Sequence, residues 1–155
     1  MSDEVKGLPE RFMGTFKLSR SENFEEFLAS KGVNWFLRKM ISFASVTKVF
    51  SRSDEIQGGY NLWNQTSRKD TVYRNWKLEE EFKAEGLDGK MHKIKFDFDP
   101  TTESLKETHI RIDDPNDQGE TYTYTVDGDI LVLSIANEKA ACKRYFIRQL
   151  FPSGQ

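Results

Sequence analysis

From Val46 onward, apolar and polar residues alternate in short runs that are separated by turn-forming residues. Such period-two alternation predicts β-strands with one buried and one exposed face. The alternating apolar residues are Ile94, Phe96 and Phe98; Ile110 and Ile112; Tyr122, Tyr124 and Val126; and Leu131, Leu133 and Ile135. Turns are predicted at Gly58-Gly59, Asp88-Gly89, Asp99-Pro100, 113–119 and Asp127-Gly128. No helical pattern separates these strands, so we expect an antiparallel meander, which hides its edges best by closing into a barrel.

A first strand and a helical hairpin are predicted ahead of this meander. The strand is expected to begin near Phe12, and Gly14 within it indicates a bulge or a close approach of another part of the chain. Asn23 and Glu26 fit a capping box for a first helix that ends at Gly32. A second helix is expected from Val33 to about Phe43, with the apolar stripe Val33, Phe36, Leu37, Met40 and Ile41.

The size and charge of the chain narrow the class of protein. A length of 155 residues predicts one domain with a real core. We expect this domain at 12–149, between a flexible extension at 1–11 and a flexible tail at 150–155. The 13% of aromatic residues fit strands around a large apolar interior. The net charge of −2 argues against non-specific binding of nucleic acid, because such binding depends on neutralising phosphates.

The last predicted strand, 141–148, carries a charge where an apolar residue is expected. In a strand, Cys142, Arg144 and Phe146 share one face, and that face should be the inner one. A guanidinium cannot lose its charge, so burying it requires an anionic or hydrogen-bonded partner. We expect this partner to be the head group of a fatty acid held inside the barrel, although cavity water and backbone carbonyls are an alternative.

The motifs of common enzymes and metal sites are missing from the sequence. The two histidines, His92 and His109, lie far apart along the chain and near no pair of cysteines. No GxGxxG, GxxxxGK, GxSxG or HExxH pattern occurs. We therefore expect no metal, no cofactor and no enzymatic activity. An enzyme acting on lipids would have Cys142 as its one nucleophile on the inner face, and a small buried hydrophobe is the simpler interpretation of that residue.

Several segments together resemble the intracellular lipid-binding proteins, the family that includes the fatty-acid-binding proteins. The segments 12–18 (FMGTFKL) and 21–24 (SENF) resemble the family's opening signature. The segment 76–82 (WKLEEEF) resembles its mid-barrel strand, 126–129 (VDGD) its late hairpin, and 142–146 (CKRYF) its closing Cys-x-Arg-x-Tyr. These matches are collinear from about Phe12 to Arg148, which makes them more specific than any one motif.

The resemblance implies an all-β fold: a ten-stranded, antiparallel, up-and-down barrel of the lipocalin-like kind, shaped like a clam and capped by a two-helix lid. It implies a non-enzymatic monomeric carrier that holds a long-chain fatty acid in an internal cavity. Carriers of retinoids or of other neutral or signalling lipids share the fold and remain an alternative. The loops at 65–70 and 113–119 are similar to the extended loops of the nematode members, which are typically secreted. We thus expect a secreted mature chain, with a cytoplasmic protein as the alternative.

The resemblance transfers the ligand's carboxylate clamp only in part. The family holds the carboxylate with the Arg-x-Tyr of the last strand and a second arginine on an earlier strand. Arg144 matches the first arginine, but Phe146 stands at the tyrosine position, and no Arg or Lys occurs from Glu120 to Glu138. Hydroxyl groups that can replace the missing donors, depending on which set faces inward, belong to Thr123, Thr125, Tyr122 and Tyr124.

Other site residues follow from their positions in the family pattern. Four residues fall where members line the cavity or its portal, with ordinary core packing as the competing explanation: Phe24, Val33, Leu37 and Trp76. Three basic residues on or beside the lid suggest transient contact with anionic membranes, with a solvated helix face as the competing explanation: Lys31, Arg38 and Lys39. Asn64-Gln65-Thr66 is an N-glycosylation sequon that we expect on a loop.

Overall fold

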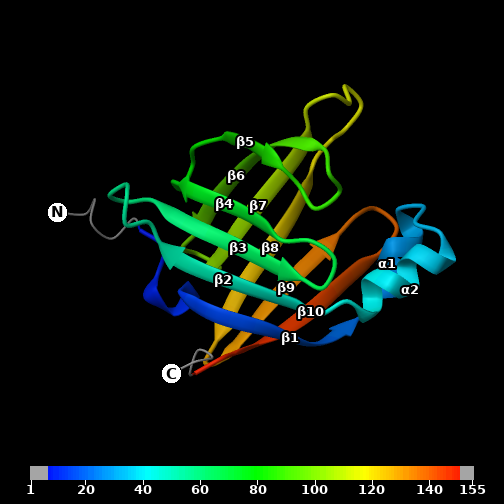
Figure 1. The fold of residues 1–155 in the computed structure, drawn as a ribbon, viewed down its shortest axis with the longest axis horizontal. Helices are drawn as coiled ribbons and strands as arrows, with labels where there is room; N and C mark the ends of the chain where they lie inside the picture. Colours follow the sequence, from blue (N-terminus) through cyan, green and yellow to red (C-terminus); the bar gives the residue numbers. More distant parts are fainter. Residues whose placement is uncertain (1–6, 151–155) are drawn as a thin grey trace.

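The computed structural model describes residues 7–150. Ten strands form one antiparallel sheet that curls into a nearly closed barrel, and two helices lie at one of its ends (Figure 1). The strands are β1 (Gly14–Glu22), β2 (Val46–Arg52), β3 (Tyr60–Thr66), β4 (Thr71–Trp76), β5 (Phe82–Glu85), β6 (Met91–Asp99), β7 (Ser104–Arg111), β8 (Glu120–Asp127), β9 (Ile130–Ala136) and β10 (Ala141–Arg148). The helices are α1 (Phe24–Ser30) and α2 (Trp35–Phe43). The expected fold class is therefore confirmed.

The sheet closes because the first strand pairs with the last. β1 lies between β2 and β10, and the remaining strands follow in chain order to the two edges, β4 and β5. Side chains bridge this seam between the edges: the rings of Trp76 and Phe96 stack with centroids 3.8 Å apart, and Lys69 pairs with Glu85 at 2.9 Å. The segment 77–81, which we expected inside a strand, is instead the connection between β4 and β5.

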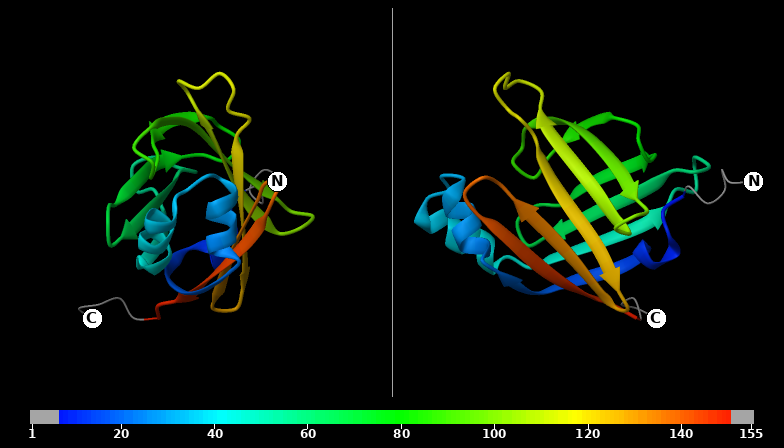
Figure 2. Two further views of the ribbon diagram at one scale, coloured as in Figure 1. Left: turned by 90° about the vertical axis from the view of Figure 1, so that its right-hand side faces the viewer. Right: turned by 180° about the vertical axis from the view of Figure 1, so that it is seen from behind.

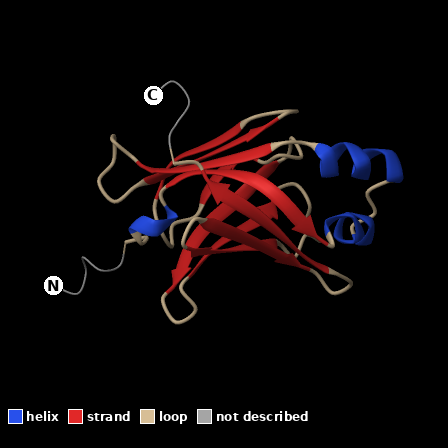
Figure 3. Cartoon of the chain, turned by 90° about the horizontal axis from the view of Figure 1, so that it is seen from below, coloured by secondary structure: helices blue, strands red, loops and turns tan. Residues whose placement is uncertain are grey.

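The lid and a short 3-10 helix (Glu10–Phe12) lie at opposite ends of the barrel (Figure 3). Within the segment expected to be a flexible extension, Leu8 is buried and its backbone N–H donates to the Tyr60 hydroxyl at 2.8 Å. Phe12 is also fully buried, so this segment packs against one end of the barrel. Residues 1–6 and 151–155, which include most of the expected tail, lie outside the described residues. The expected domain boundaries stay a prediction.

The helical hairpin lies in front of the barrel when the molecule is viewed along the barrel from that side (Figure 2). The predicted capping box at its start is wrong. Asn23 adopts a left-handed conformation (φ 61°), and its side chain donates to the carbonyl of Ala141 at 2.9 Å instead of capping α1. The second helix begins two residues later than expected, because the Asn34 side chain caps it by accepting from the Leu37 N–H.

The predicted turns separate the observed strands, and of the two loops expected to be extended, one is long and the other is short. The β3–β4 connection covers only 67–70, so the extended loop expected at 65–70 is a four-residue turn. The β7–β8 connection at 112–119 is long and projects from the barrel wall (yellow in Figure 1). Among the described residues, no helix is both long enough and apolar enough to cross a lipid bilayer.

Strand β7 reverses the expected orientation. Ile110 and Ile112, predicted to share a buried face, are 36% and 40% exposed. The alternating buried residues of β7 are instead Leu105, Glu107 and His109, and Ser104 at the start of the strand is buried as well. The inner face of this strand is therefore charged, which is stable only where the charges find partners. These partners define the candidate site.

Candidate functional site

The inner wall of the barrel combines aromatic residues with a set of buried polar groups. The inward positions of β6, β8 and β10 follow the predicted alternation, so Phe96, Tyr124 and Phe146 are fully buried. The buried polar and charged residues are Lys48, Asn64, Thr71, His92, Ser104, Glu107, His109 and Arg144. Burying a polar group costs free energy unless it has a hydrogen-bond partner, so we expect each of these residues to have one.

Arg144 lies inside the barrel, as the alternation of β10 predicts. The residue is 7% exposed, and its Nε donates to the Ser21 hydroxyl at 2.9 Å. Its guanidinium covers the ring of Phe24 from α1 at 3.8 Å. Among the described residues, Nη2 of Arg144 has no hydrogen-bond partner although it is buried. Burial lowers the pKa of Arg144 to about 10, so the group is a cation at neutral pH with a donor left over.

Lys48 is a second buried cation, and it was not predicted from the sequence. It lies on β2 and is 7% exposed. Its Nζ donates to Asn64 Oδ1 at 2.7 Å and lies 5.5 Å from the ring centroid of Tyr124. The pKa of Lys48 is lowered to about 8: burial lowers it most, the charge of Glu107 raises it, and the charge of Arg144 lowers it. The signal in the sequence was its place between Val46 and Phe50 in a strand with alternating burial.

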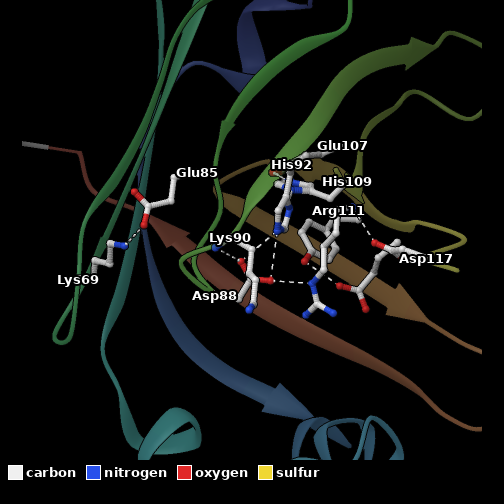
Figure 4. A network of polar contacts seen from close by, with 11 residues as sticks. Lys69, Glu85, Asp88, Lys90, His92, Glu107, His109, Arg111 and Asp117 are labelled. Carbon is white, nitrogen blue, oxygen red and sulfur yellow. Dashed lines mark hydrogen bonds and ion pairs between the residues drawn. The ribbon is translucent and has the colours of Figure 1, made fainter. Parts of the chain in front are cut away.

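Glu107 anchors a polar network that runs from the interior to the surface (Figure 4). Its carboxylate accepts from the Tyr124 hydroxyl at 2.8 Å and contacts His109 Nε2. The Nδ1 atoms of His109 and His92 are 2.8 Å apart, and His92 Nε2 lies 3.0 Å from the Asp88 carboxylate. Burial opposes ionisation of Glu107, but His109, Lys48 and Tyr124 together hold its pKa below the usual range. The glutamate is thus a buried anion.

The same network reaches solvent at the turn between β5 and β6. Arg111 Nε donates to Asp88 Oδ2 at 3.0 Å, and the Arg111 backbone N–H donates to Asp117 in the long β7–β8 connection. The two histidines, far apart in the sequence, are therefore neighbours in space. Within residues 7–150, no group of three or more His, Cys, Asp or Glu side chains has the arrangement of a metal site.

The hydroxyl groups considered as replacements for the missing clamp donors divide between the two faces of β8. The tyrosines face inward and the threonines outward, as the burial of β8 indicates. Tyr124 donates its hydroxyl to Glu107, and Tyr122 donates to Glu120 at 2.8 Å. Both tyrosine donors are therefore already used. Phe146 is fully buried beside Arg144 and supplies only its ring.

The residues that were expected at the cavity or its portal divide between the barrel wall and the lid. Trp76 is buried (2% exposed) at the β4–β5 seam, and its indole N–H has no partner among the described residues. Phe24 is half-buried beneath Arg144, so it links the lid to the inner wall. Val33 and Leu37 are half-buried in the lid. The structure thus brings Phe24 and Phe146 to Arg144.

The basic residues of the lid are engaged within the protein. Lys31 pairs with Glu120 on β8 at 2.9 Å, and Lys39 pairs with Glu25 on α1 at 3.0 Å. Arg38 donates to the Val33 carbonyl at 2.8 Å. The exposed feature of the lid is apolar instead: three aromatic residues of α2 are 62%, 68% and 82% exposed, namely Trp35, Phe36 and Phe43.

The burial of Asn64 and of Cys142 bears on two further expectations, the glycosylation sequon and the reactivity of the thiol. Asn64 is not on a loop, because it lies within β3, is 3% exposed and points to Lys48. The sequon is therefore inaccessible to glycosylation in the folded chain. Cys142 is 4% exposed, and burial raises the pKa of its thiol, which disfavours the reactive thiolate.

The known proteins that are similar to this chain in sequence and in structure include several that are named as fatty-acid-binding proteins or their homologues. No family model matches the chain. "Fatty acid-binding protein homolog 3" from Caenorhabditis elegans is 48% identical over 148 residues, covering 96% of this chain and 88% of the relative. "Fatty acid-binding protein homolog" from Ascaris suum is 46% identical, covering 94% and 89%. The solved structure of "As-p18, an extracellular fatty acid binding protein" has a TM-score of 0.88 and 45% identity, covering 93% of this chain and all of that chain.

Proposed function

Because the chain belongs to the fatty-acid-binding protein family and is a non-enzymatic lipid carrier, we propose that its ligand is a long-chain fatty acid whose carboxylate binds Arg144. The observation that carries this proposal is the buried guanidinium with a free Nη2 donor on the inner wall. A carboxylate is the partner that such a donor prefers. In this proposal the alkyl chain of the fatty acid lies inside the barrel, between its inner walls.

The apolar inner wall and Arg144 are expected to contribute differently to the free energy of ligand binding. Burial of each methylene contributes roughly 0.8 kcal/mol, so a sixteen-carbon chain gains about 12 kcal/mol before the costs of association. A hydrogen bond to a charged group contributes about 1.5–3 kcal/mol. Apolar contact therefore sets most of the affinity, and Arg144 sets the orientation and the preference for acids.

Arg144→Met is expected to lower the affinity for palmitic acid about tenfold and to leave the affinity for methyl palmitate unchanged. Calorimetric titration of delipidated protein with both ligands measures this. Arg74→Met, which removes an exposed arginine on β4, is the matched control. Equal wild-type affinities for the acid and the ester contradict the assigned role of Arg144. Displacement of palmitic acid by retinol at lower concentration favours the retinoid alternative.

We also propose that the lid contacts membranes through the exposed apolar residues of α2. Trp35, Phe36 and Phe43 protrude, while Lys31 and Lys39 are paired with acidic residues of the chain itself. A helix with such a face can lie in a bilayer interface. Apolar contact is therefore the main attraction in this proposal, and anionic lipid adds to it.

Phe36→Ser is expected to slow transfer of a fluorescent fatty acid to phosphatidylcholine vesicles about threefold or more, because it removes apolar area from the contact. Stopped-flow transfer to vesicles with and without phosphatidylserine measures this. Ile56→Ser, which removes an exposed apolar residue from the β2–β3 connection, serves as the control. A transfer rate that does not depend on vesicle concentration contradicts a collision with the membrane.

The extracellular location named for As-p18 supports secretion of this chain as well. We therefore propose that this chain is secreted. Immunodetection of the protein in the fluid outside the producing cells tests this. The monomeric state remains a prediction that sedimentation analysis tests.

A further inference from the structure

The inner wall holds two cations, Arg144 and Lys48. Like Arg144, Lys48 has hydrogen-bond donors that have no partner among the described residues. Lys48 Nζ has three protons to donate, and among the described residues Asn64 Oδ1 is the one acceptor within hydrogen-bond distance. The Asn64 amide is itself fixed by donating to Thr71 Oγ1 at 3.3 Å. Lys48 is therefore held in a defined position by one hydrogen bond, with donors left for another group.

The buried anion of the site does not use these donors. Glu107 Oε1 accepts from Tyr124, and Oε2 contacts His109. Glu107 therefore compensates charge in the interior without forming a hydrogen bond to Lys48. Lys48 and Arg144 together carry two positive charges against the one negative charge of Glu107. One additional carboxylate balances these three groups.

Lys48 and Arg144 lie on the two strands that flank β1. In register with β1, Lys48 lies opposite Phe16 and Arg144 lies opposite Ser21. The positive charge of Arg144 nevertheless lowers the pKa of Lys48, so the two cations interact across β1. Phe146 connects them: it follows Arg144 at the next inward position of β10, and its ring centroid lies 5.9 Å from Lys48 Nζ. The ring of Phe146 therefore lies between the two cations along the inner wall.

We propose that Lys48 is the second anchor for the ligand's head group, and that the carboxylate lies between Arg144 Nη2 and Lys48 Nζ. This inference rests on the proposed function, since it assigns a further residue to the same site. It explains how the chain can bind an acid although β8 supplies no arginine or lysine. In this arrangement the second cation comes from β2, almost a hundred residues earlier in the sequence.

A lysine anchor gives the site a pH dependence that an arginine does not. Lys48 has a pKa of about 8 and loses its charge above that pH, whereas Arg144, at about 10, keeps its charge between pH 7 and pH 9. The other ionisable groups that face Lys48 are Glu107 and Tyr124, and burial together with Glu107 raises the pKa of Tyr124 well above its usual value. Glu107 is already ionised in this range. Affinity for an acid should therefore fall as the pH rises from 7 to 9.

Lys48→Met tests the inference, because methionine fills similar space without charge and relieves the cost of burying an ion. We expect the ratio of the affinities for palmitic acid and methyl palmitate to fall about tenfold at pH 7. We also expect the fall in palmitic acid affinity between pH 7 and pH 9 to disappear in this variant. Lys93→Met, which removes an exposed lysine on β6, is the matched control and should behave as the wild type.

The outcomes separate the inference from the function on which it rests. If wild-type protein prefers the acid and Lys48→Met keeps the same ratio and the same pH dependence, Lys48 is not an anchor. A loss of affinity that is equal for the acid and the ester also overturns the inference, because it indicates a general effect on packing. If the wild type binds neither ligand, the proposed function itself fails.

Discussion

Glu107→Ala is expected to lower the free energy of unfolding by about 3–5 kcal/mol, because it removes one partner from a buried, charged network. Three groups lose a partner: Lys48 loses its compensating charge, and Tyr124 and His109 each lose a hydrogen-bond partner. An uncompensated charge inside a barrel is more costly than a missing contact. Denaturant unfolding of delipidated protein, with lipid excluded so that it does not add stability, measures the change.

The matched control is Glu85→Ala, which breaks the exposed ion pair with Lys69 and should cost less than about 1 kcal/mol. Glu107→Gln should lie between the two variants, because the amide can still accept from Tyr124 while the charge is lost. A loss below about 1 kcal/mol for Glu107→Ala means that the interior tolerates two unbalanced cations.

The direction of the pH dependence follows from the same carboxylate. The folded-state pKa of Glu107 lies below its ordinary value of 4.5. Its contribution to stability is therefore fully present above pH 4.5 and is lost as the pH falls through the folded-state pKa. Stability of the wild type should thus decline in acid more steeply than stability of Glu107→Gln.

The alternation of residues was sufficient to predict the barrel, because most strands have one apolar face that must be buried. On β6, β8 and β9 the predicted inner residues are those that the structure buries or half-buries. On β7 the same reasoning selected the wrong face. Ile110 and Ile112 are apolar but exposed, whereas Glu107 and His109 are inside. A strand that builds a polar site cannot be oriented by hydrophobicity alone.

A residue of the candidate site could be predicted from the sequence only where its neighbours on the same strand indicate that it is buried. Arg144 was found because it interrupts an apolar face between Cys142 and Phe146. Lys48 was not found, because its partners come from other strands. Asn64 lies opposite it on β3, and Tyr124 and Glu107 come near it only when the sheet closes. The pair His92 and His109 was missed for the same reason, since antiparallel pairing of β6 with β7 brings them together.

Gly14 shows a different limit, because the sequence indicated the feature but not its cause. The glycine indeed marks a close approach, and the approaching group is the guanidinium of Arg148. Arg148 donates through Nη1 to the Met13 carbonyl at 2.8 Å and through Nη2 to the Arg11 carbonyl at 2.9 Å. It also pairs with Asp129 in the β8–β9 turn at 3.2 Å. One side chain thus joins the last strand to the segment that packs against the end of the barrel.

Gly14→Ala is expected to lower the free energy of unfolding by about 2–4 kcal/mol, for two independent reasons. Gly14 has φ +136°, which costs a residue with a side chain about 1–3 kcal/mol. A Cβ at this position also lies 2.8 Å from Arg148 Nη1, so the guanidinium must move and lose a charge-assisted hydrogen bond. Thermal and denaturant unfolding of the variant measure the total.

A second glycine and a double mutant separate these two reasons. Gly58 has φ +79°, and a Cβ added there would meet nothing within 4 Å, so Gly58→Ala reports backbone strain alone. Arg148→Met removes the group that the new methyl would displace. If that displacement matters, the effects of Gly14→Ala and Arg148→Met are less than additive, with a coupling of about 1 kcal/mol or more. Simple additivity, together with equal losses for Gly14→Ala and Gly58→Ala, leaves backbone strain as the one reason for a glycine at the start of β1.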